Sequence, residues 1–358
     1  MTEDTCDGDV KSSVTLEPKN SASPSGIARK VKISEMAKSD PIERALNRLS
    51  ELRRADALET VAEEVRGFLR NRSNLVVAKA AKVVRELQIK ALVPDMVAAF
   101  DKLMTDAPRL DKRCAATTEI VGALYELNYV EPAPYLAGLK HVQMEASFGP
   151  PVDEAAKLRA VSAQGLVRTR HPDALAEVMQ LLVDREPAAR IGALRALAVN
   201  GGEAGILLLK LKVLTGDVEP AVLGECFAGL LEASRDRSVP FVAKYIDSED
   251  GDVAEAAMLA LGESRLPAAY EVLKEKCART IAMPEKKVLL AAMAASKLDE
   301  AIAFLVSLIE TESIPTAAAG LEALSIYSRN ERVRKSVSDA VLSRRNETLA
   351  DYFKRDFA

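Results

Sequence analysis

The stretch that decides the fold is residues 184–197, DREPAARIGALRAL, because its alanine-rich apolar pattern recurs along the chain. Segments of the same kind end at Leu166, Leu197, Leu230, Leu261, Ala294 and Leu324. Their ends are separated by roughly 30 to 33 residues, a period typical of repeat arrays in which each unit packs only on its neighbours. We therefore predict an all-α fold, a right-handed α-α superhelix of about eight to nine helical hairpins.

Each unit is predicted to hold a first helix with the alanine-rich segment, a turn, a return helix and a loop. In residues 187–216, Pro187 opens the first helix, residues 200–202 (NGG) break it, and Ile206 to Leu214 form the return helix. Proline in a first helical turn removes no intrahelical hydrogen bond, so it marks a start. The next unit begins in the same way at Pro220, one repeat period further on.

The chain divides into a tail and one elongated array. Residues 1–38 are rich in Ser, Lys, Asp and Pro, and we expect them to be disordered because they hold little apolar surface to bury. Residues 39–358 are predicted to form the helical array, closed by charged capping helices. Residues 141–152, HVQMEASFGPPV, lengthen one unit by about ten residues and are expected to form an extended loop between two repeats.

Composition excludes several classes of protein. Of the 358 residues, 48% are hydrophobic, 4% are aromatic and none is Trp, and the formal charge is -4, so nucleic acid is not an expected partner. The four cysteines lie far apart, which predicts neither a disulfide framework nor a zinc site. We find no secretory signal and no apolar stretch long enough to span a bilayer, and we therefore expect a cytoplasmic protein with no metal or cofactor.

The repeated segments resemble the HEAT-repeat class, including its bacterial "PBS-lyase HEAT-like" subgroup. The resemblance rests on residues 184–197 and, more loosely, on residues 250–261 (DGDVAEAAMLAL), and it extends over most of residues 150–325. It implies a helical solenoid and a pairing of Asp184 with Arg190. The position of Arg190 is taken in later units by Leu223, Ala254 and Lys287, so we do not expect this pairing to continue along the array.

Enzymes of related fold leave marks that this chain lacks. Deoxyhypusine hydroxylases hold two irons with His-Glu dipeptides, whereas the two histidines here, His141 and His171, precede Val142 and Pro172. No GxSxG, HExxH or phosphate-binding glycine loop is present. We therefore predict a scaffold or adaptor that is not an enzyme. A PBS-lyase-like enzyme, or a subunit that handles a chromophore, is the alternative.

A lysine strip follows the repeat period. Lys212, Lys244 and Lys276 recur at equal steps of about 32 residues, with Lys210 and Lys274 beside them. Because return helices line the concave side of HEAT-type solenoids, this strip is a candidate surface for a protein partner, which would be acidic. The simpler interpretation is that these lysines only keep the surface solvated.

Overall fold

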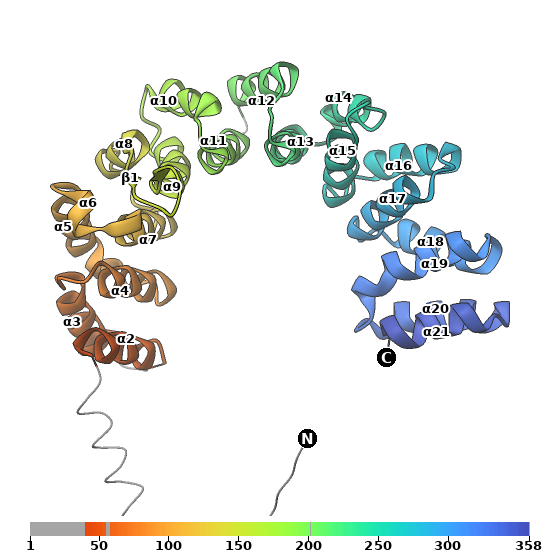
Figure 1. The fold of residues 1–358 in the computed structure, drawn as a ribbon, viewed down its shortest axis with the longest axis horizontal. Coiled ribbons are helices and arrows are strands. Elements are labelled where there is room, and N and C mark those ends of the chain that lie inside the picture. The colour runs from red at the N-terminus through yellow and green to blue at the C-terminus, as the bar shows by residue number, and fades with distance from the viewer. Residues whose placement is uncertain (1–39, 55–57, 201, 358) are drawn as a thin grey trace, which may run out of the picture.

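The computed structural model describes residues 40–54, 58–200 and 202–357, which form an arched stack of helical hairpins (Figure 1). The first helices of the successive units are α2 (Pro41–Leu52), α4 (Asn74–Glu86), α7 (Ala115–Glu126), α9 (Ala156–Arg168), α11 (Pro187–Asn200), α13 (Pro220–Ser234), α15 (Gly251–Glu263), α17 (Met283–Ala295) and α19 (Ile314–Leu324). The return helices are α3 (Leu58–Leu69), α5 (Val93–Met104), α8 (Ala133–Lys140), α10 (Ala174–Gln180), α12 (Glu203–Thr215), α14 (Val239–Val242), α16 (Pro267–Arg279), α18 (Asp299–Thr311) and α20 (Glu331–Arg344). The described residues thus hold nine hairpins, which confirms the all-α solenoid that the period predicts.

Shorter elements join the helices. A single helical turn, α6 (Ala107–Leu110), follows α5. Six 3-10 turns lie at helix ends: η1 (Lys90–Leu92), η2 (Lys112–Cys114), η3 (Leu181–Val183), η4 (Arg235–Arg237), η5 (Ala243–Tyr245) and η6 (Ser325–Tyr327). The expected loop at residues 141–152 contains an antiparallel pair of two-residue strands, β1 (Met144–Glu145) and β2 (Val152–Asp153).

Helix starts follow from local side-chain chemistry. The Asp40 carboxylate accepts the backbone N–H of Ile42 at 3.0 Å, and Pro41 occupies the first position of α2. Asp250 caps α15 in the same way, accepting from the N–H of Asp252 at 3.0 Å. Both arrangements satisfy donors that a helix start leaves without partners inside the helix.

The first helices line the inner side of the arch and the return helices line the outer side (Figure 1). The prediction that return helices form the concave side is therefore wrong. The physical reason is the close approach of the first helices, each of which packs on the next. A Cβ placed on Gly262 of α15 would lie 2.1 Å from the backbone oxygen of Ala292 in α17, and one on Gly192 of α11 would lie 2.3 Å from Cα of Ala160 in α9. The row whose backbones approach most closely becomes the inner row of a curved stack.

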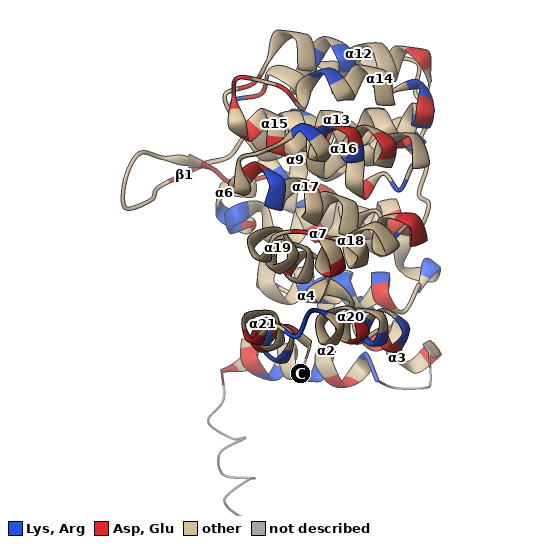
Figure 2. Cartoon of the chain, turned by 90° about the vertical axis from the view of Figure 1, so that its right-hand side faces the viewer, with Lys and Arg blue, Asp and Glu red and all other residues tan. Residues whose placement is uncertain are grey.

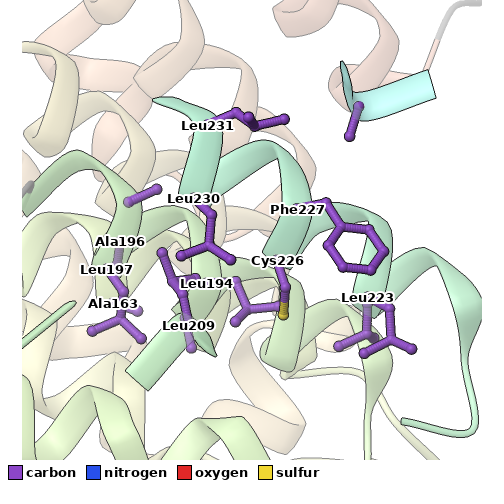
Figure 3. Packing of buried hydrophobic residues seen from close by; sticks show 14 of the residues in the cluster. Ala163, Leu194, Ala196, Leu197, Leu209, Leu223, Cys226, Phe227, Leu230 and Leu231 are labelled. Atoms are coloured by element: carbon purple, nitrogen blue, oxygen red, sulfur yellow. The ribbon is translucent and has the colours of Figure 1, made fainter. Parts of the chain in front are cut away.

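The core runs without interruption between the two rows. Figure 3 shows Leu194 and Leu197 of α11, Leu209 of α12, and Cys226 and Leu230 of α13 gathered where two units meet. All five side chains are fully buried. Each unit therefore completes the core of its neighbour, as expected for a solenoid.

A final helix, α21 (Glu347–Phe357), covers the end of the inner row by packing on α19. Leu349 and Phe357 are buried there, and the rings of Phe353 and Phe357 stack with centroids 5.2 Å apart. The capping role that the sequence predicts for the C-terminal residues stays a prediction. The predicted tail, residues 1–38, lies outside the described residues.

Candidate functional site

The predicted lysine strip lies on the outer row. Lys210 and Lys212 belong to α12, Lys244 to η5, and Lys274 and Lys276 to α16, and these elements are part of the outer row (Figure 1). The expectation that these five residues line the concave face is therefore wrong, because it assumed that the return helices form the inner row.

Two of these lysines hold neighbouring units together. Lys212 Nζ lies 2.8 Å from Asp217 Oδ2, and only 10% of its side chain is exposed. Lys276 Nζ lies 2.7 Å from Asp247 and 2.6 Å from Glu285. Burial alone would lower the pKa of Lys276, but the hydrogen bonds to the two carboxylates outweigh burial and raise it. These ammonium groups are engaged by the protein itself.

The neighbouring lysines contact aromatic rings. Lys210 Nζ lies 5.6 Å from the centroid of the Phe241 ring, and Lys274 Nζ lies 5.7 Å from that of Tyr270 and 5.9 Å from that of Phe304. Such cation-π contacts are weak at exposed sites but fix the position of the charge. Four of the five lysines thus make contacts within the array, two with carboxylates and two with aromatic rings.

A second ladder of charges runs through the first helices. Arg159 Nε lies 2.9 Å from Asp184 Oδ2, and Arg159 Nη1 lies 2.8 Å from Asp153. One unit later, Arg190 Nη2 lies 2.8 Å from Asp217 Oδ1, and Arg190 Nη1 donates to the backbone oxygen of Asp184 at 2.8 Å. Each arginine therefore pairs with the aspartate of the following unit. The implied side-chain pairing of Asp184 with Arg190 is corrected to Arg159 with Asp184 and Arg190 with Asp217.

The ladder ends where the sequence predicts. After Asp217 the arginine position is taken by Leu223, and Asp250 only caps its helix. Burial would raise the pKa of Asp217, but hydrogen bonds from Lys212, the N–H of Glu219 and Arg190 lower it overall. Ionised Asp217 thus neutralises two cations that are themselves largely buried.

The hairpin of β1 and β2 projects from the edge of the array (Figure 2). Its base is anchored by Gln143, whose Nε2 donates to the backbone oxygen of Asp111 at 3.0 Å, and by Arg159, whose Nη1 donates to the oxygen of His141 at 2.9 Å. Its tip carries Phe148, which is fully exposed. The Gly149-Pro150-Pro151 sequence that indicated a helix break thus lies at the turn of a small hairpin.

A groove of about 750 Å³ lies beside this hairpin along the N-terminal turns of α4, α7 and α9. Its lining includes Leu75, Lys157, Glu154 and Cys114. Arg113 and Cys114 have consecutive left-handed backbones, with φ of 62° and 48°, a conformation that costs free energy in residues other than glycine. Burial, followed by the nearby negative charge of Asp111, raises the pKa of the Cys114 thiol to about 12. A protonated thiol of this kind is not a nucleophile at neutral pH.

The four central helices of the inner row divide by charge. α9 and α11 contain no acidic residue, and their exposed charges are Lys157, Arg168 and Arg195. α13 and α15 contain no basic residue, and their exposed carboxylates include those of Glu232, Asp252, Glu255 and Glu263. The two halves meet where Arg195 Nη2 lies 2.8 Å from Glu225 Oε2. We call these four helices the divided inner face. The charges of the first helices, taken by themselves, would have indicated this face in the sequence. The recurring lysines did not indicate it, because they lie on the return helices.

The histidines have local structural roles. His171 Nδ1 accepts the N–H of Asp173 at 3.2 Å just before α10, and His141 Nε2 lies 3.1 Å from Gln143 Oε1. Over the described part of the chain, no group of three His, Cys, Asp or Glu side chains is arranged to hold a metal ion. Among the same residues, no helix combines the length and the apolar character needed to cross a bilayer.

Comparisons with known proteins add little about function. No protein-family model matches the chain, and no curated protein matches it. The complex of CpcE and CpcF of phycocyanin lyase from Nostoc sp. PCC7120 shares 14% identity over 64% of this chain and 91% of the other, with a TM-score of 0.34. An engineered protein shares 19% identity over 91% of this chain and 97% of the other, also with a TM-score of 0.34. Neither likeness carries an argument about function at this level of similarity.

The helices themselves define the class. Hairpins of similar length repeat along the chain, each pairs a first helix with an antiparallel return helix, and first helices stack on first helices. The protein is a helical-repeat solenoid, the architecture that the resemblance to HEAT repeats implies. This class fixes an architecture, and its members differ in what they bind, so the function must be argued from the surface.

Proposed function

We propose that this protein is a non-catalytic scaffold that binds a protein partner along the inner side of the arch. The observation that carries this proposal is the divided inner face, with basic side chains on α9 and α11 and acidic ones on α13 and α15. A partner segment with an acidic stretch beside α9 and α11 and a basic stretch beside α13 and α15 would match both halves. The acidic partner expected from the lysine strip is thus replaced by one that carries both charges.

The carboxylates of the divided inner face are available for such a partner. Within the described residues, Glu232, Glu255 and Glu263 take part in no ion pair. Each is exposed, and the helix that carries it holds no Lys or Arg. Gathering like charges produces a local field that steers an oppositely charged partner and fixes its register. A curved inner row also lets one extended segment contact several units at once.

The proposal is tested by reversing charge on one side of the arch at a time. The inner variant is Glu232→Lys, Glu255→Lys and Glu263→Lys together. The matched control is Glu271→Lys, Glu275→Lys and Glu310→Lys, which makes the same change in charge on outer helices α16 and α18. Proteins captured from extract by tagged wild type and by each variant are quantified by mass spectrometry, with circular dichroism as the check on folding.

We expect the inner variant to lose at least about tenfold of a specific captured protein and the outer variant to retain it. Capture should also fall between 0.1 M and 1 M salt, because the screening length shortens from about 10 Å to about 3 Å. Equal capture by both variants would refute the role of the divided inner face. A visible absorption band in the purified protein would instead favour the alternative, a chromophore-handling protein.

A further inference from the structure

Exposed apolar side chains lie on α10, η3 and α12 of the outer row and in the loop that follows α12. We call this group the outer patch. Its members and exposed fractions are Met179 (46%), Val183 (82%), Leu207 (57%), Leu211 (54%), Leu214 (69%) and Val218 (91%). Ile206, Leu209 and Val213 of α12 are buried on the opposite side of that helix, so α12 is apolar on both its inward and its outward side. A surface helix of a globular protein normally keeps its outward side polar.

The fold does not require apolar residues at these positions. Lys210 and Lys212 of α12 correspond to Lys274 and Lys276 of α16, two units further along, which fixes the register of the two helices. In that register Leu207 corresponds to Glu271 and Leu211 to Glu275, and both glutamates are exposed. The same outward positions are thus charged in α16 and apolar in α12. Some contact other than the packing of the array is needed to account for leucine there.

The spacing of these side chains suits pairing with an identical helix. Leu207, Leu211 and Leu214 of α12 follow the four-three spacing of a heptad seam, and Val218 lies beyond Gly216, where a φ of 76° ends the helix. In an antiparallel pair centred close to Leu211, Leu207 of one copy lies near Leu214 of the other and the two Leu211 side chains meet near the axis. A two-fold interface requires such self-complementarity.

Charge and size also favour a second copy. The six residues carry no charge, and the two lysines of α12 are engaged within the chain, Lys210 by the Phe241 ring and Lys212 by Asp217, whereas the α16 face with its two glutamates would repel itself. The 13 residues of α12 span about 20 Å. Together, α12 and the neighbouring α10 give the apolar centre of the outer patch an area of roughly 400 Å². A stable interface buries about 800 Å² per partner, with an apolar centre and a polar rim.

From these observations we propose that the outer patch is the interface of a two-fold homodimer, in which α12 of one copy packs antiparallel on α12 of the other. The dimer joins the arches by their convex sides and leaves both divided inner faces open. It is therefore independent of the proposed scaffold function, and either proposal can fail without the other.

The test replaces the leucines with the residues that α16 already carries, in the variant Leu207→Glu and Leu211→Glu. Its matched control, Ala268→Glu and Ala278→Glu, adds the same charge at exposed positions of α16 outside the outer patch. Molar mass is measured by light scattering and analytical ultracentrifugation from about 1 to 100 µM, and circular dichroism confirms that each variant is folded.

We expect the wild type and the control to have twice the chain mass of 38.6 kDa and the leucine variant to have the mass of one chain. The dissociation constant of the leucine variant should rise by at least about 100-fold. A wild type that stays monomeric at 100 µM would overturn the dimer and leave the outer patch to a different protein. A folded leucine variant that remains dimeric would also overturn it, because the interface would then lie elsewhere.

Discussion

Asp217 combines two tasks at one position. Its Oδ1 accepts the N–H of Glu219 at 2.9 Å, which orders the turn before α13, and the same carboxylate pairs with Arg190 and Lys212. The side chains of all three ion-pair members are at most 10% exposed. The carboxylate therefore matters to the fold both as a turn-forming acceptor and as a buried negative charge.

Replacing Asp217 with Asn separates these tasks. Asn keeps an oxygen that accepts from the backbone, but it leaves Arg190 and Lys212 without a counter-charge, and removing one partner of a buried pair costs about 3 to 5 kcal/mol. We expect the free energy of unfolding of Asp217→Asn to fall by about 3 kcal/mol in chemical denaturation. The control is Asp250→Asn at the equivalent position of the next unit, where the aspartate only caps α15 and Asn caps equally well. A loss of similar size in both variants would contradict the role of the buried charge.

The elements show where sequence patterns suffice and where they do not. Helix positions were predictable because apolar spacing and first-turn prolines are local properties, as at Pro187 and Pro220. The order of the two rows was not, because it depends on how closely backbones approach at Gly192 and Gly262. The ion-pair partners of Lys276 could not be predicted either. Asp247 and Glu285 lie in or beside turns, and a repeat period does not specify the geometry of turns.

The close approach of α15 and α17 gives a prediction for one element. In Gly262→Ala the new methyl group would overlap the backbone of Ala292, so the two first helices must move apart. Overpacking of this kind costs about 1 to 3 kcal/mol, and we expect the free energy of unfolding to fall by that amount. In the control, Gly67→Ala in α3, a Cβ meets nothing within 4 Å, and the higher helix propensity of alanine should raise stability by about 0.5 to 1 kcal/mol. Equal stability of Gly262→Ala and wild type would show that the inner row is looser than its contacts indicate.

At the scale of the whole molecule, the main contacts of each described unit are with its neighbours. α11 packs on α9, α10, α12 and α13, and no contact of comparable extent links it to either end of the arch within the described residues. The repeat period predicted this arrangement, because a recurring unit that cannot close its own core must be completed by the next. The period could not predict the divided inner face, since the charges of α9, α11, α13 and α15 lie outside the recurring apolar pattern.

The contacts between neighbours also determine how far a local defect spreads. In a solenoid, stability is close to a sum of unit and interface terms, so the Asp217→Asn defect should stay near the interface that it weakens. We expect faster amide hydrogen exchange in α11, α12 and α13, and unchanged exchange in α3 to α5 and in α18 to α21, as measured by mass spectrometry under native conditions. Asp250→Asn serves again as the control and should leave all of these helices unchanged. A uniform rise in exchange along the whole array would contradict the expectation, because it would mean that the arch opens as one cooperative unit rather than unit by unit.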